Sequence, residues 1–248
     1  MRSISLVLAA WLTLPSLALA ATPEELAALD ALFAKRGDAA ALKQLDDSLD
    51  QALAATPEDF ELLWRSARVR QWQADGASDA KLKKSLGKQT WDLGDRARKV
   101  SPDRVEGHYF AALGVGAYAQ GLGVLTALGE GIEGKFNERL DKAVKMDPMY
   151  ERGGPLLAKA RYYYELPWPK RDLKKSAELC RKAADKHPEM LRAWLFLSET
   201  LLADGQEKEA QEAILKVTQG STAYDPPEAQ RMQSRAKKVQ ADIEKALQ

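Results

Sequence analysis

The sequence predicts an all-α protein built from stacked helix-turn-helix repeats, an α-solenoid or α-α superhelix. The composition is that of an ordinary globular chain, with 45% apolar and 29% charged residues over 248 positions. Apolar and small residues recur at helical spacing in paired segments. Prolines that close such pairs follow at intervals of 38 to 46 residues by their numbering: Pro57, Pro102, Pro148, Pro188 and Pro226. Proline is common just after a helix ends because it cannot continue the helix.

The clearest repeat begins at Trp194 and ends at Val217. A turn at Asp204-Gly205 separates two helical segments, and the key residues lie at offsets 0, 3, 4, 7, 16, 20 and 23 from the first. The residues at these offsets are Trp194, Leu197, Ser198, Leu201, Ala210, Ile214 and Val217. This is the pattern of a tetratricopeptide (TPR) helix pair, in which we expect Trp194 to be buried. One pair cannot bury its own apolar face, so the pattern predicts neighbouring pairs stacked on it.

The same spacing recurs upstream. The first pair carries Leu29, Leu32, Phe33, Leu45, Leu49 and Ala52, with Arg36 at an otherwise apolar position. Together with the prolines, this predicts a single domain over residues 21–248, with pairs at 23–57, 58–102, 103–148, 149–188 and 189–225. A capping helix at 226–247 carries Met232, Val239, Ile243 and Leu247 on one side. We therefore expect about 11 helices, with the length beyond an ideal 34-residue repeat placed between the two helices of a pair.

The first 20 residues have the features of a cleaved signal peptide. A short apolar run, Ile4 to Leu14, is followed by Pro15-Ser16 and by Ala18-Leu19-Ala20, a small-x-small cleavage motif. A buried N-terminal core helix is the alternative. Since position 21 is alanine, lipid modification is not indicated. We expect a periplasmic or secreted protein whose mature chain has no transmembrane segment.

Three segments depart from the repeat pattern. Gln71 to Gln89 is lysine-rich and predicts a solvated helix or loop. Gly114 to Gly134 holds seven of the 16 glycines, which is costly in a helix unless something offsets it. Two explanations remain open: close packing between helices, or a wall that lets a ligand or partner approach the backbone.

Trp168, between Pro167 and Pro169, either fills a gap between helices or anchors a protein contact. The candidate binding residues are Tyr109, Tyr118, Gly121, Gly123, Leu125 and Trp168.

The sequence offers little support for catalysis, a metal or a cofactor. The formal net charge of +1 does not indicate a basic surface for binding nucleic acid. The two histidines, His108 and His187, form no metal-binding motif, and the single cysteine, Cys180, falls on an apolar helix position without a nearby base. We therefore expect no enzymatic activity and no cofactor.

Two family resemblances follow from longer runs of residues. The runs Tyr109–Gly114, Leu140–Pro148 and Ala160–Pro167, with Asp172–Ser176 opening the next helix, resemble the T component of TRAP transporters. That resemblance implies a periplasmic TPR-like protein that docks on a solute-binding protein and forms oligomers with apolar channels, here around Gly114–Gly134. The lipidation cysteine of many T components is missing. The segment from Glu130 to Trp168 is also similar to the regulator of microtubule dynamics family.

These observations predict a binding protein. The favoured function is a periplasmic scaffold that contacts a protein partner, such as a solute-binding protein. The alternative is a carrier that holds an apolar small molecule near the glycine-rich segment. For either function we expect association with further copies of the chain, because stacked repeats with an apolar insertion expose apolar surface.

Overall fold

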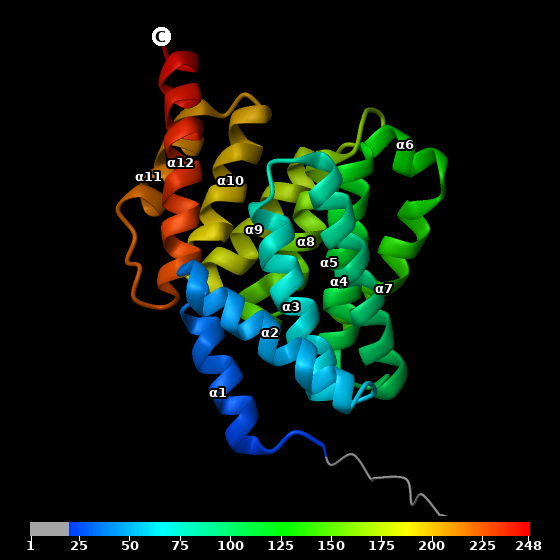
Figure 1. Cartoon of the computed structure of the whole chain (residues 1–248). Helices are drawn as coiled ribbons and strands as arrows, with labels where there is room; N and C mark the ends of the chain where they lie inside the picture. The colour runs from blue at the N-terminus through cyan, green and yellow to red at the C-terminus, as the bar shows by residue number, and fades with distance from the viewer. Residues whose placement is uncertain (1–19) are drawn as a thin grey trace, which may run out of the picture.

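The computed structural model describes residues 20–248. The proposed signal peptide therefore lies outside the described residues, except for Ala20. The described part contains twelve α-helices and no strand, which confirms the predicted all-helical class. The helices are α1 (Pro23–Ala34), α2 (Ala39–Ala55), α3 (Phe60–Gly76), α4 (Ala80–Val100), α5 (Val105–Leu122), α6 (Val124–Gly129), α7 (Ile132–Met146), α8 (Tyr150–Glu165), α9 (Leu173–Lys186), α10 (Leu191–Ala203), α11 (Glu207–Thr218) and α12 (Pro226–Ala246) (Figure 1).

Side-chain caps explain where many of these helices begin. Thr22 and Glu25 form a capping box at α1. Aspartate side chains accept hydrogen bonds from the first-turn amides of α2, α3, α4, α9 and α12. Proline occupies the first turn of α1 and α12, where its missing amide proton costs nothing. The start of each of these helices is thus fixed locally by the sequence.

The helices form two layers. An inner layer consists of α1, α3, α5, α8, α10 and α12, each in contact with the next member of the series. An outer layer consists of α2, α4, α7, α9 and α11, each packed between its two neighbours in the chain. This is the stacked-pair arrangement that the spacing predicts. The short α6 is the addition that raises the number of helices above the expected 11.

The repeat at the C-terminal side is packed as expected in all but one position. Leu197, Leu201, Ile214 and Val217 are buried in one large apolar cluster with residues of α9 and α12. Trp194 is only half-buried, so the expectation that it is a core residue was wrong. Its indole Nε1 donates a hydrogen bond to the carbonyl of Pro188 at 3.0 Å. This bond holds the ring at the edge of the cluster, over the preceding loop.

Glycines on α4 and α5 form a seam between the two helices. Gly87 and Gly94 of α4, and Gly107, Gly114 and Gly121 of α5, repeat every seven residues. At each of them, a Cβ atom would lie 2.2 to 2.5 Å from a backbone atom of the facing helix. We call these five residues the glycine seam. For Gly114 and Gly121, close helix packing is thus the correct explanation of the glycine-rich segment.

The lysine-rich segment 71–89 is also mostly helical. Residues 71–89 are the end of α3, a short turn and the first part of α4, with Trp72, Ala74 and Leu86 buried. The extra length in this pair therefore extends the helices and does not form a separate solvated insertion. In the segment 20–248, no helix combines the length and the apolar character that crossing a membrane requires.

Candidate functional site

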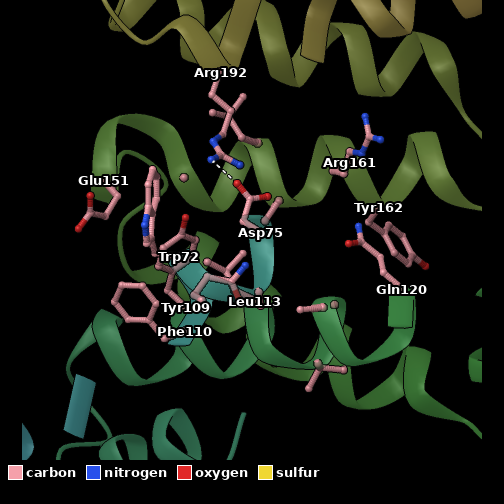
Figure 2. Close-up of a pocket in the computed structure, with 18 of the residues that line it drawn as sticks. Trp72, Asp75, Tyr109, Phe110, Leu113, Gln120, Glu151, Arg161, Tyr162 and Arg192 are labelled. Atoms are coloured by element: carbon pink, nitrogen blue, oxygen red, sulfur yellow. Dashed lines mark hydrogen bonds and ion pairs between the residues drawn. The ribbon is translucent and has the colours of Figure 1, made fainter. Parts of the chain in front are cut away.

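A cavity of about 580 Å³ lies against the inner layer of helices. Its walls come from all six inner helices, from α6 and α7, and from Lys83 of α4. Figure 2 shows it in close-up, with Glu151, Trp72 and Tyr109 at one side, Asp75 and Arg192 in the middle, and Gln120, Arg161 and Tyr162 at the other. The volume falls in the range typical of small-molecule sites.

The end of the cavity near α6 is largely apolar. Its walls are the last two turns of α5, the helices α6 and α7, and the end of α8. The apolar and small residues here are Gly116, Ala117, Ala119, Val124, Ala127, Leu128, Ile132, Phe136 and Leu166. The glycine seam explains this composition: because α5 presents its glycines to α4, its opposite face is left to line the cavity.

An ion-pair network crosses the middle of the cavity. The Asp75 carboxylate lies 2.9 Å from the guanidinium of Arg192, 3.5 Å from that of Arg231 and 3.8 Å from that of Arg235. Arg192 also donates to Glu228 Oε1 at 2.5 Å. Burial alone would raise the pKa of Asp75, but the charge and hydrogen bond of Arg192, with the other two arginines, hold it well below its usual range.

This network joins the two ends of the stack. Asp75 belongs to α3, Arg192 to α10, and Arg231 and Arg235 to α12. Arg231 also donates to the carbonyl of Trp72 at 2.9 Å and stacks on its ring. Arg36 at the end of α1 pairs with Asp225 at 2.6 Å. Side chains near the end of α1 and the start of α12 thus close the inner layer around the cavity. Figure 1 shows the end of α1 beside the start of α12.

The far end of the cavity contains a strained turn. At the start of α8, Glu151 and Arg152 have φ of 48° and 55°, and Gly153 has φ of 89°. Left-handed backbone is costly for non-glycine residues and persists where the surroundings hold it, often at functional sites. The turn directs Glu151 and Arg152 to the cavity wall. Partial desolvation by the surrounding helices raises the pKa of Glu151, although the charges of Arg68, Arg36 and Arg152 oppose that shift.

Several polar groups of the cavity wall have no hydrogen-bond partner among residues 20–248. The buried Oε1 of Gln71 and the buried Nε atoms of Arg36 and Arg68 have none. The carboxylate of Glu151, an exposed residue of the wall, forms neither an ion pair nor a hydrogen bond there. The hydroxyl of Tyr109, whose pKa is raised by burial, also forms none. It points at Gly154, where a Cβ would lie 2.4 Å from the hydroxyl oxygen. Since buried polar groups in proteins are nearly always hydrogen-bonded, Gln71 Oε1 and the Nε atoms of Arg36 and Arg68 mark a place for a polar group from outside the chain.

The six residues that the sequence put forward as binding residues lie in different parts of the structure, and only some of them are near the cavity. Tyr109 lines the cavity, whereas Tyr118 packs edge-on against Trp91, with ring centroids 6.0 Å apart. Gly121 belongs to the glycine seam, and Gly123 makes the turn into α6 with φ of 94°. Leu125 and Trp168 are 74% and 89% exposed. The idea that Trp168 fills a gap between helices was therefore wrong.

Sequence reasoning missed Gln71, Asp75, Glu151 and Arg192. A signal for one of them was present: Gly153, Gly154 and Pro155 near the start of a helix predict an irregular turn beside Glu151. No comparable signal marks the other three, because their role depends on helices that are distant in sequence.

Cysteine and histidine take no part in this site. Burial raises the pKa of Cys180 to about 12, so its thiol stays protonated at neutral pH. The ring of His108 is hydrogen-bonded to the carbonyl of Pro102 at 2.9 Å, and His187 caps the end of α9. Neither histidine lines the cavity.

Comparison with known proteins places the chain in a family. Residues 26–173, more than half of the sequence, match the model of the regulator of microtubule dynamics protein 1-3 family. The chain belongs to this family. The match extends well beyond the segment 130–168 in which the sequence resembles it. No curated protein matches the chain significantly in sequence.

A solved structure supports the repeat architecture. The crystal structure of a thermophilic TPR protein from Thermus thermophilus is similar to this family member with a TM-score of 0.64. The alignment covers 87% of this chain and 97% of that one, at 18% identity. This likeness confirms the TPR-like fold. The specific resemblance to TRAP-transporter T components stays a prediction.

Proposed function

We propose that this protein is a non-enzymatic binding protein that holds an amphipathic small molecule in its inner cavity. The observation that carries the proposal is the division of the cavity. One end is apolar, and the other offers the unpartnered Oε1 of Gln71 and Nε atoms of Arg36 and Arg68, with Glu151 and Tyr109 beside them in the wall. An elongated ligand would place its apolar part between α5, α6 and α7 and its hydrogen-bonding head beside α8.

The charges of the wall favour a head group that is uncharged or carries hydroxyl groups. The cavity-lining arginines already have carboxylate partners, as in Arg36 with Asp225, Arg68 with Asp30 and Arg152 with Glu189. The Nε atoms of Arg36 and Arg68 are still free to donate to a carbonyl or hydroxyl oxygen of a head group, whereas an anionic head would compete with the carboxylates already paired to these arginines. A hydroxyl or amide can donate to Glu151 and accept from Tyr109 without doing so.

The test compares two alanine-to-phenylalanine variants of the full chain. Ala158→Phe fills the cavity, because Ala158 is in its wall, whereas Ala241→Phe adds the same ring on the exposed side of α12. Native mass spectrometry of purified protein would detect a bound molecule, and an environment-sensitive apolar dye would report cavity occupancy. We expect the wild type and Ala241→Phe to bind, and Ala158→Phe to lose binding while keeping its helical content. Equal dye binding by both variants would overturn the proposal.

A scaffold role is the second candidate. It is supported by the TPR-like architecture, because superhelical repeat proteins present extended binding surfaces to partners. The finer form of this proposal is an exported T component that docks on a periplasmic solute-binding protein, and it rests on the resemblance of residues 109–176 to that family. Crosslinking followed by enrichment of a solute-binding protein supports it. An empty result under crosslinking counts against it.

A further inference from the structure

We propose that the α6 end of the molecule docks on an anionic lipid bilayer. The α6 end is defined as the first turns of α4 (80–85), the helix α6, and the connection from α8 to α9 with the first residues of α9 (166–175). This inference goes beyond the proposed function, because docking on a surface does not depend on what the cavity holds. It rests on the placement of apolar and basic side chains, all of which except Lys83 lie outside the cavity wall.

Three segments distant in sequence come together at this end. A Cβ at Gly121, in the last turn of α5, would lie 2.5 Å from the amide nitrogen of Lys84 and 2.7 Å from the carbonyl oxygen of Ala80. The first turn of α4 is therefore beside the start of α6. The Lys170 ammonium lies 2.6 Å from the Glu133 carboxylate, which joins the α8–α9 connection to the first turn of α7. Figure 1 shows the α3–α4 turn, α6 and the α8–α9 connection at the upper end of the view.

Each of these segments carries a large apolar side chain into solvent. Leu82 is 51% exposed, Leu125 74% and Trp168 89%, and the last two are the most exposed large apolar residues of the described chain. Trp168 is carried on a fixed loop, since Lys170 N donates to Pro167 O at 3.0 Å and Asp172 N to Tyr163 O at 3.1 Å. Tryptophan is enriched where proteins meet the interface of a bilayer, because its ring is apolar and its N–H is polar.

The same end is rich in basic side chains that have no carboxylate partner within residues 20–248. These are Lys81, Lys83, Lys84, Arg171, Lys174 and Lys175, none of which forms an ion pair there. Of the nearby acids, Asp79 caps α4, Asp172 caps α9 and Glu133 pairs with Lys170, while Glu130 at the end of α6 is exposed. The basic side chains thus outnumber the acids at this end. Clusters of about four to eight basic residues next to apolar anchors are typical of surfaces that bind anionic lipids.

A bilayer fits this arrangement better than an acidic protein does. The three exposed apolar side chains belong to three segments that are distant in sequence. A flat, deformable surface can accept all three at once, and its negative charge complements the lysines around them. Val124 and Leu166 of the cavity wall belong to the same segments, so docking would bring the apolar end of the cavity to the lipid.

The test measures co-sedimentation of the full chain with vesicles. One set contains phosphatidylcholine alone, and the other one part phosphatidylglycerol to two parts phosphatidylcholine. We expect binding to the anionic set only, with loss of binding in concentrated salt because the attraction is screened. Leu125→Ser combined with Trp168→Ser, and separately Lys174→Glu combined with Lys175→Glu, should each weaken binding at least about tenfold. All four side chains are exposed, so circular dichroism should stay unchanged.

Matched controls decide the interpretation. Lys99→Glu combined with Lys142→Glu makes the same charge change on exposed residues away from this end, and Leu215→Ser removes a partly exposed leucine of α11. Both should bind vesicles as the wild type does. No binding to anionic vesicles, or equal losses in the controls, overturns the proposal. Binding to polyglutamate without binding to vesicles overturns it in favour of an acidic protein partner.

Discussion

The α4–α5 pair and the α10–α11 pair have the same antiparallel arrangement but are held together in different ways. The first packs backbone to backbone through the glycine seam. The second packs through large side chains, among them Leu197, Leu201, Ile214 and Val217. Because the seam uses glycines on one face of α5, the opposite face contributes eight residues to the cavity, whereas α10 itself contributes Arg192 and Phe196. The way a pair packs therefore decides how much of its inner helix is available to a ligand.

The largest loss of stability is expected from a substitution that disrupts the glycine seam. At Gly114 even a Cβ would lie 2.2 Å from the amide nitrogen of Trp91 and 2.6 Å from its Cα. Gly114→Leu must push the two backbones apart, so its loss of unfolding free energy should exceed the roughly 1–3 kcal/mol that is typical of overpacked cores. Urea denaturation followed by circular dichroism measures it. The control is Gly134→Leu, at a glycine with open space around it; equal stability of the two variants would contradict the seam.

The second prediction concerns the ion pair that links the two regions, Asp75 of α3 with Arg192 of α10. Asp75→Asn leaves Arg192 short of a partner and should cost about 3–5 kcal/mol of unfolding free energy. Because the pKa of Asp75 is lowered on folding, its contribution is present above the unfolded value near 3.8 and is lost as the pH falls below it. Wild-type stability should thus fall on acidification more steeply than that of Asp75→Asn. Parallel pH profiles would show that the pair does not carry this linkage.

The third prediction concerns Trp194, which lies at the edge of the α10–α11 pair. Trp194 is half-buried and contacts the core only in part. Trp194→Ala should therefore cost about 1–2 kcal/mol, below the range of roughly 3–5 kcal/mol for a fully buried tryptophan. Chemical denaturation decides between the two values, with Trp168→Ala as the exposed reference. A loss as large as that of a core residue would mean that the ring is buried in solution.

The smallest effect has the opposite sign. Gly134 lies inside α7 and no heavy atom would approach an added Cβ within 4 Å. Gly134→Ala should raise the unfolding free energy by up to about 1 kcal/mol, because alanine has the better helix propensity. A shift of the thermal midpoint measures it. A destabilised variant would show that this glycine, too, is needed for packing.

Much of the fold could be predicted from local pattern. Prolines and capping residues mark helix ends, and the spacing from Leu197 to Val217 predicts a buried face that the structure contains. The glycine-rich segment was harder, because packing against α4 and exposure to a ligand both favour glycine. The structure separates them residue by residue: Gly114 and Gly121 face α4, whereas Gly116 lies in the cavity wall.

The candidate site could not be predicted in the same way. Asp75 and Arg192 are 117 residues apart in sequence, and nothing near either one indicates the other. Glu151 acquires its position from a left-handed turn that depends on the packing around α8. Tyr109 was put forward as a binding residue, yet its free hydroxyl becomes evident only once the helices that surround it are placed.

The contacts between the first and last helices change how the stack should unfold. In an open repeat array each unit touches only its neighbours, so the array can unzip from either terminus. Here Arg36 holds Asp225, and Arg231 holds the carbonyl of Trp72, which ties the free ends to one another. We therefore expect fraying of α1 to loosen the start of α12 as well, so that the stack melts more cooperatively than an open array.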